Sequence, residues 1–180
     1  SPQDTVELSR AINDPDRSGQ EKDQARRLLR LNNFSDQIDL LAYCLMPNHY
    51  HLLIKQVSPR AIELFMRSFV TRYVQYFNHR HNKRVGSLFQ DTYKAVLVNS
   101  EEQLLHLSRY IHRNPFQKGV SLQESPRPSS LPNFLGKISQ NWVKPQEILS
   151  YFSKSGFNSY ESFVNDSSID GISIASIYDY

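Results

Sequence analysis

The chain lacks the residues that build several common kinds of site. Among its 180 residues there is a single cysteine, Cys44, so no disulfide can close within the chain and no paired cysteine ligands exist. No glycine-rich phosphate loop and no Ser/His/Asp arrangement are visible. There is also no signal peptide and no apolar run long enough to cross a membrane. These absences favour a cytoplasmic protein with no membrane partner and point away from thiol-metal, P-loop and serine-hydrolase chemistry.

The composition is that of an ordinary globular protein, with 39% hydrophobic and 22% charged residues. The net charge of +3 is too small to indicate a partner by itself. The distribution of charge is more informative, because acidic residues gather in the first quarter and the tail while the middle of the chain is basic. The basic residues of this middle region are Arg67, Arg72, Arg80, Lys83, Arg84, Lys94, Arg109, Arg113 and Lys118.

Apolar periodicity predicts a helix followed by a hairpin in the first third of the chain. Residues 21–32 have the spacing of a helix, after a polar and broken first stretch at 1–20. Residues 37–46 are almost continuously apolar and residues 49–56 are rich in Leu and Ile, so the two segments predict two strands. Pro47-Asn48 between them is a turn signal, so we expect an antiparallel hairpin.

A second helix, a third strand and a third helix follow. Ser58-Pro59 is expected to begin a long helix, with Ser58 as its N-cap, and Gly86 to end it. Residues 93–98, YKAVLV, predict a strand. Ser100 is expected to cap a helix that ends at Asn114.

This order of elements predicts a ferredoxin-like, split βαβ domain of the α+β class. Such a domain has an antiparallel sheet with helices on one face. Its opening strand is not visible and is expected to lie before residue 1. We predict a catalytic domain over residues 1–120, then a linker, a small helical extension and a loosely ordered tail over 121–180.

The segment PNHYHLL, residues 47–53, can present two imidazoles from one rigid surface. Side chains two apart on a strand point to the same face, so His49 and His51 could bind one divalent metal while Tyr50 anchors the other face. The alternative is a pair of histidines without a metal. An isolated pair favours that alternative, whereas the apolar strands around this pair make a more demanding context.

The segment LSRYIHRNP, residues 107–115, places a phenol and an amide on one helix face. Tyr110 and Asn114 are four residues apart, and both can reach the edge of a sheet. An amide oxygen can complete a metal site begun by two histidines, and a phenol can act as a nucleophile once deprotonated. The alternative is an amphipathic tyrosine at the edge of a core.

Three blocks together resemble the single-tyrosine HUH transposases, and most closely the REP-associated tyrosine transposases. They are YCLMPNHYHLLIKQ at 43–56, GSLFQDTYKAVLV at 86–98 and LLHLSRYIHRNP at 104–115. The resemblance implies an HUH motif on a central strand, with His49, His51 and Asn114 holding Mg²⁺ or Mn²⁺ and Tyr110 as nucleophile.

The same resemblance implies the reaction. It is DNA transposition through cleavage and rejoining of single-stranded DNA, with a 5′-phosphotyrosine intermediate on the enzyme. The substrate would be hairpin-forming DNA, and a homodimer is one open oligomeric state. Two alternatives remain: a nickase of the rolling-circle initiator or relaxase type, and a catalytically silent module that binds DNA hairpins.

Several other residues are weaker candidates. Basic residues that could bind DNA are Arg72, Arg80, Lys83, Arg84, Lys94, Arg109 and Arg113, with a solvated surface as the alternative. Tyr76 is a rival nucleophile, but Arg80 stands where an amide ligand would be needed. His106 and His112 lie off the predicted metal face and receive no role beyond DNA contact.

Overall fold

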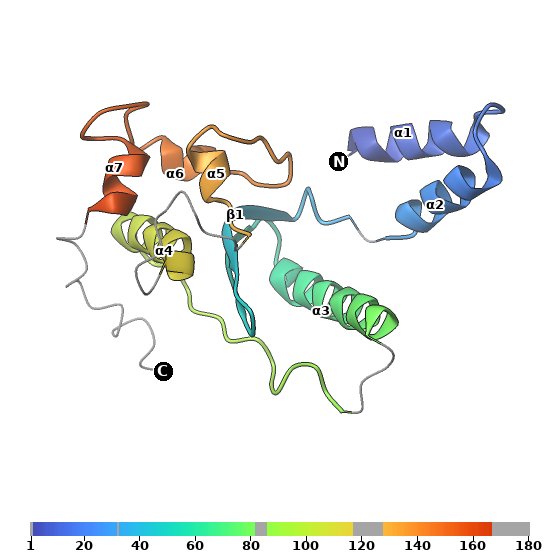
Figure 1. Ribbon diagram of the computed structural model, residues 1–180, viewed down its shortest axis with the longest axis horizontal. Coiled ribbons are helices and arrows are strands. Elements are labelled where there is room, and N and C mark those ends of the chain that lie inside the picture. Colours follow the sequence, from blue (N-terminus) through green and yellow to red (C-terminus); the bar gives the residue numbers. More distant parts are fainter. Residues whose placement is uncertain (1, 32, 82–85, 117–127, 167–180) are drawn as a thin grey trace. The chain divides into compact units, whose positions relative to one another are not determined.

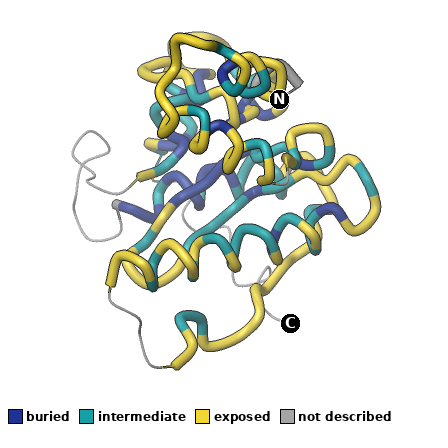
Figure 2. Tube along the Cα trace, turned by 90° about the vertical axis from the view of Figure 1, so that its right-hand side faces the viewer, coloured by how far each residue is buried: buried dark blue, intermediate teal, exposed yellow. Residues whose placement is uncertain are grey.

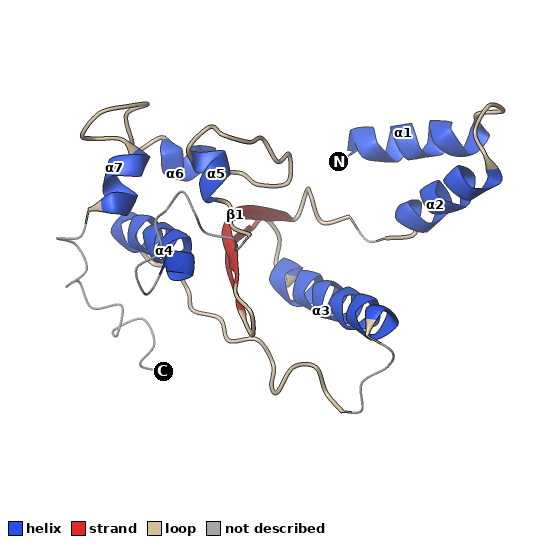
Figure 3. Cartoon of the chain, in the orientation of Figure 1, coloured by secondary structure: helices blue, strands red, loops and turns tan. Residues whose placement is uncertain are grey.

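The computed structural model describes residues 2–31, 33–81, 86–116 and 128–166 (Figure 1). The chain forms two compact units. One comprises residues 1–38 with 56–90, and the other comprises 39–55 with 91–180. The first unit is helical, and the second combines a hairpin with helices, so the predicted α+β class is confirmed and is compatible with a split βαβ fold (Figure 3). No helix in the described part of the chain has the length and apolarity needed to cross a membrane.

The first unit opens with two helices that lie side by side, α1 (Pro2–Asn13) and α2 (Gly19–Leu29) (Figure 1). The chain is broken around Pro15, as expected, at residues 14–18, whereas helix α1 before this break was not predicted. A capping box fixes the start of α2: the Ser18 side chain accepts from the Glu21 backbone N–H, and the Glu21 carboxylate accepts from the Ser18 N–H. The helix expected over 21–32 is confirmed, with both ends two or three residues earlier.

The third helix of this unit, α3 (Ala61–Arg80), begins later than the sequence predicts. Its N-cap is Arg60, in the left-handed conformation with φ of 63°, and not Ser58. The chain makes a turn first, in which the Ser58 carbonyl accepts from the first helical N–H at 3.2 Å. Gln56 then replaces the missing cap, because its Oε1 accepts from the N–H of Ile62 at 3.4 Å.

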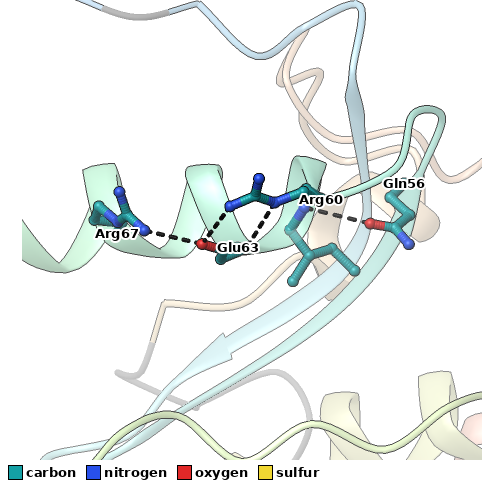
Figure 4. Close-up of polar contacts among 5 residues, drawn as sticks. Gln56, Arg60, Glu63 and Arg67 are labelled. Atoms are coloured by element: carbon teal, nitrogen blue, oxygen red, sulfur yellow. Dashed lines mark hydrogen bonds and ion pairs between the residues drawn. The ribbon is translucent and has the colours of Figure 1, made fainter.

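Charged side chains reinforce this helix start. The Glu63 carboxylate binds Arg60 from the preceding turn and Arg67 from the next one (Figure 4). All three side chains are exposed, so these ion pairs contribute little stability. They do hold a negative charge in the first turn, which suits the helix dipole.

The second unit contains the predicted hairpin. Its strands are β1 (Ile38–Leu45) and β2 (Tyr50–Gln56). Pro47-Asn48 form the turn, which is closed by a 2.8 Å hydrogen bond from the Met46 N–H to the His49 carbonyl. Most of β1 is buried, whereas β2 is largely half-buried (Figure 2).

The strand predicted at 93–98 is wrong. In the described part of the chain, residues 92–99 form no ladder, and the sheet has two strands (Figure 3). Tyr93, Val96 and Leu97 are exposed by 42%, 46% and 76%. An apolar pattern indicates side chains that pack well in a sheet. A strand also needs a neighbouring backbone to pair with, and that neighbour comes from a distant part of the chain. A central-strand position for the two histidines is not confirmed either.

The remaining helices close the core of the second unit. They are α4 (Glu101–Arg113), a short 3₁₀ turn η1 (Asn114–Phe116), α5 (Leu131–Phe134), α6 (Gln146–Leu149) and α7 (Tyr160–Asn165). Residues 128–166 also cover the outer edge of β1, through a bridge from Ser129 to Cys44 and another from Val143 to Leu40. The buried core cluster consists of Leu41, Ala42, Cys44, Leu53, Ile111, Leu131, Phe134, Ile148, Tyr160 and Val164.

The predicted C-terminal extension therefore shares one core with the hairpin and α4. Most of the predicted linker, 121–130, lies outside the described residues, and from residue 128 onward the described chain packs in the second unit. A functional division between 1–120 and 121–180 stays a prediction.

Candidate active site

The two histidines of PNHYHLL stand at the beginning of β2. His49 is the last residue before the strand and His51 lies within it. Their ring centroids are 5.0 Å apart, with the rings nearly perpendicular at 88°. The Nδ1 of His49 lies 2.8 Å from the Oδ1 of Asn48, which orients that ring from the turn. The two imidazoles are therefore neighbours, as the alternation along a strand predicts.

Helix α4 brings Tyr110 to this pair. The centroids of the His51 and Tyr110 rings are 5.5 Å apart, in an edge-to-face arrangement at 78°. The helix start is fixed as predicted, because the Ser100 hydroxyl accepts from the Gln103 N–H. Its register against β2 follows from the core, where Leu53 and Ile111 belong to the same buried cluster. Ile111 follows Tyr110 directly on α4, and Leu53 lies two residues after His51 on β2.

Asn114 is the C-cap of α4, four residues after Tyr110. Its backbone N–H donates to the Tyr110 carbonyl, so the two side chains lie one helical turn apart on one face. Asn114 is 4% exposed, and its Nδ2 is buried without a hydrogen-bond partner among the described contacts. A buried amide without a partner is costly, which makes this side chain a candidate for binding something from outside the chain.

His51 has the same unusual status. Its Nε2 is buried without a hydrogen-bond partner. Burial lowers the pKa of His51 below its usual range, and the nearby charge of His49 lowers it further. Both effects favour the neutral imidazole, which is the form that ligates metals. Within the described residues no three His, Cys, Asp and Glu side chains group together, so a metal here would need the amide of Asn114 as its third protein ligand.

The opposite side of α4 carries a buried polar network that the sequence did not reveal. His112 is fully buried, with its Nδ1 2.7 Å from the Tyr160 hydroxyl and its Nε2 2.7 Å from the Ser130 hydroxyl. Tyr160 also donates to Ser108 at 3.0 Å, and Ser108 donates to the Leu105 carbonyl. The chain of donors therefore runs from Ser130 through a neutral His112 and Tyr160 to Ser108.

The network ties α4 to β1 and to α7. The Tyr43 N–H of β1 donates to the Ser130 hydroxyl at 2.8 Å. Burial lowers the pKa of His112 to about 3 and raises that of Tyr160. The expectation that His112 has no role beyond DNA contact is wrong. The four-residue spacing of Ser108 and His112 on an otherwise apolar face was the available signal.

Arg109 is also buried, so the expectation of a DNA contact or a solvated charge at this position is wrong. It is 5% exposed, and its guanidinium donates to the carbonyls of Phe163 and Asp166 at the end of α7. Arg113 donates to the same Asp166 carbonyl at 3.4 Å. Cationic groups are favourable at the C-terminus of a helix, so these arginines join α4 to α7.

The other predicted DNA-binding residues are distributed over both units. Arg80 on α3 and Lys94 are exposed, and Arg72 on α3 is half-buried. Lys83 and Arg84 lie outside the described residues. Their contact with DNA remains a prediction.

One protein family matches the chain over a stretch that includes the candidate site residues. The family described as "Transposase IS200 like" matches residues 17–114, more than half of the chain, and the match spans His49, His51, Tyr110 and Asn114. Comparisons with curated proteins and with solved structures gave no significant match. The chain therefore belongs to the IS200-like transposase family.

Proposed function

We propose that the chain is a metal-dependent single-strand DNA endonuclease and strand transferase of the HUH type, with Tyr110 as its nucleophile. The observation that carries the proposal is the 5.5 Å approach of the Tyr110 ring to His51, with His49 a further 5.0 Å along. These side chains come from a hairpin and from a helix that is distant in sequence. Packing at the edge of a core would not by itself require two histidines beside this tyrosine.

The side chains present fit a divalent cation, and the resemblance to HUH transposases implies Mg²⁺ or Mn²⁺. His49, His51 and Asn114 offer imidazole nitrogens and an amide oxygen, and two of the three have a buried polar atom without a partner. The orphaned atom of Asn114 is the amide nitrogen, and a half-turn of the amide exchanges it with the oxygen. When bound, such a cation would polarise the scissile phosphate and stabilise charge in the transition state.

In the proposed reaction one P–O bond forms as another breaks, and one proton moves from the phenol to the leaving group. The Tyr110 oxygen attacks the phosphorus, a 5′-phosphotyrosine bond forms, and the bond to the 3′ oxygen breaks. The phenol loses its proton and the leaving 3′ oxygen gains one. A different 3′-hydroxyl can then reverse the step, so two DNA ends are joined without a nucleotide cofactor.

The proposed substrate is single-stranded DNA that forms a hairpin, as for REP-associated relatives. Exposed cations such as Arg80 and Lys94 suit a polyanion, since phosphate contacts provide most of the affinity of such proteins. A site between a hairpin and a helix suits a single strand, whose phosphate can enter more easily than that of a duplex.

The test is formation of a covalent adduct. The full chain is incubated with a labelled hairpin oligonucleotide and Mn²⁺ and analysed on a denaturing gel. We expect a protein–DNA band that disappears in Tyr110→Phe and persists in Tyr76→Phe. His51→Ala should lower adduct formation by orders of magnitude while the fold, measured by circular dichroism, is retained.

The control separates catalysis from binding. If the wild type binds the hairpin but no adduct forms with Mn²⁺ or Mg²⁺, the proposed reaction is wrong and a silent binding module explains the site. If the adduct survives in Tyr110→Phe, the nucleophile is wrong.

A further inference from the structure

A long loop joins α5 to α6 (Figure 1). This loop contains Trp142, the only tryptophan of the chain. Its ring lies against Tyr43 of β1, with centroids 5.0 Å apart and planes inclined by 33°. Tyr43 is 6% exposed, whereas Trp142 is 54% exposed. Tyr43 thus covers one side of the indole, and much of the remaining ring surface faces solvent.

The backbone around Trp142 is fixed to β1. Val143 is buried and forms a parallel bridge with Leu40, and the Lys144 N–H donates to the Leu40 carbonyl at 2.8 Å. On the other side, the Tyr43 hydroxyl donates to Gln140 at 3.3 Å. The indole is therefore held in place by its neighbours and by the ring beneath it. A fixed aromatic ring loses little conformational entropy when a ligand stacks on it.

The charges in this loop suit a nucleic acid. Lys144 is exposed and stands two residues after Trp142, and Lys137 is exposed at the beginning of the same loop. Single-stranded DNA is bound by this combination, in which bases stack on aromatic rings and cations contact the backbone phosphates.

We propose that Trp142 is a stacking platform for an unpaired nucleobase of the DNA substrate, with Lys144 beside it for a backbone phosphate. The Tyr43–Trp142 pair shares no residue with the histidine–tyrosine site, and it would add a contact with single-stranded DNA that takes no part in the cleavage chemistry. It rests on the proposed function for the identity of the ligand, and its test does not require cleavage.

The single tryptophan permits a direct measurement. The full chain, in a chelator so that no strand is cut, is titrated with a short oligothymidine and with an abasic sugar–phosphate chain of equal length, and tryptophan fluorescence is recorded. We expect saturable quenching by the oligothymidine and little by the abasic chain. Binding to a labelled oligothymidine, followed by anisotropy, should weaken roughly fivefold to hundredfold in Trp142→Ala. Trp142→Phe should restore most of the affinity.

Matched variants give the controls. Phe157 is the most exposed large apolar residue among those described, at 90%, and Phe157→Ala should bind like the wild type. Lys144→Gln should weaken both ligands about equally and reduce the salt dependence.

Three results would overturn the proposal: equal quenching by the abasic chain, unchanged affinity in a folded Trp142→Ala, or no binding of the wild type to either ligand. A change in self-association of Trp142→Ala without a change in DNA binding would instead assign the ring to a protein contact. Failure of the Tyr110 adduct with intact base-dependent quenching would refute the proposed reaction and leave this site standing.

Discussion

At the scale of single residues, the buried polar side chains on and around α4 form two sets, one with hydrogen-bond partners and one without. His51 on β2 and Asn114 at the end of α4 have buried polar atoms without partners among the described residues. His112 and Tyr160, in contrast, are buried with their polar atoms bonded. Groups without partners are costly and suit a binding site, whereas bonded groups stabilise and position the helix. The bonded residues His112 and Tyr160 therefore hold in place the helix that carries the candidate site.

Removing the Tyr160 hydroxyl should destabilise the second unit. Tyr160→Phe keeps the buried ring but leaves the Nδ1 of His112 without a partner, and the Ser108 hydroxyl loses its donor while it keeps its bond to the Leu105 carbonyl. We expect the free energy of unfolding to fall by about 1–3 kcal/mol. Urea unfolding followed by circular dichroism measures this. Tyr76→Phe, at a tyrosine that is 60% exposed, is the control and should change little. Equal stability of both variants would contradict the network.

His112 predicts how stability depends on pH. Its folded-state pKa of about 3 lies below the ordinary value of 6.5, because burial disfavours the charged imidazole. The unfolded chain therefore binds a proton more readily. The stabilisation is complete above about pH 6.5 and is lost as the pH falls toward 3, by roughly tenfold in the folding constant for each pH unit.

His112→Gln removes this titration. Unfolding curves at pH 7.5 and 5 should show that the variant is less stable than the wild type at the higher pH and loses less stability on acidification. Curves that shift in parallel for both proteins would mean that His112 is not buried in its neutral form.

At the scale of elements, the sequence predicts best where local signals suffice. The hairpin and the start of α4 are confirmed, because Pro47-Asn48 and Ser100 fix them through contacts only a few residues away. The strand at 93–98 is wrong because its pairing depends on a distant partner. The shared helix face of Tyr110 and Asn114 could be predicted from their spacing. The partners of His112 could not, because they come from residues 130 and 160 and leave no local signal.

The start of α3 gives a prediction for one element. Arg60 adopts a left-handed conformation, which costs a residue with a Cβ more than it costs glycine. Arg60→Gly should therefore melt roughly 2–4 °C above Arg60→Ala, the reverse of their usual order near a helix. Both variants lose the same exposed pair with Glu63, so that contribution cancels. If the alanine variant melts at the same or a higher temperature, Arg60 is not left-handed in solution.

At the scale of the whole molecule, the C-terminal segment completes the second unit. It supplies Ile148 and Val164 to the core, covers the edge of β1 and bonds the buried Arg109. The sequence indicated only a small appendage, because short helices with few apolar residues have no strong periodicity. The contribution of these short helices to stability comes from their contacts with β1 and α4.

Truncation should show this dependence. A chain of residues 1–120 loses these contacts and exposes the apolar side of the hairpin, so we expect the second unit to lose its cooperative unfolding transition. A chain of residues 1–166 keeps every contact described and should unfold like the full chain. Heteronuclear NMR spectra of the three chains distinguish the outcomes. Well-dispersed β1 and α4 resonances in the shorter chain would contradict the expectation.

The most direct measurement of the central claim is the site of DNA attachment. After reaction of the full chain with a hairpin oligonucleotide and Mn²⁺, trypsin cleaves beside Arg109 and Arg113 and releases residues 110–113, in which Tyr110 is the only hydroxyl-bearing side chain. Mass spectrometry should find the nucleotide phosphate on this peptide and should find none in His51→Ala. A phosphate on another tyrosine, such as Tyr76 or Tyr50, would show that the approach of Tyr110 to His51 does not serve cleavage.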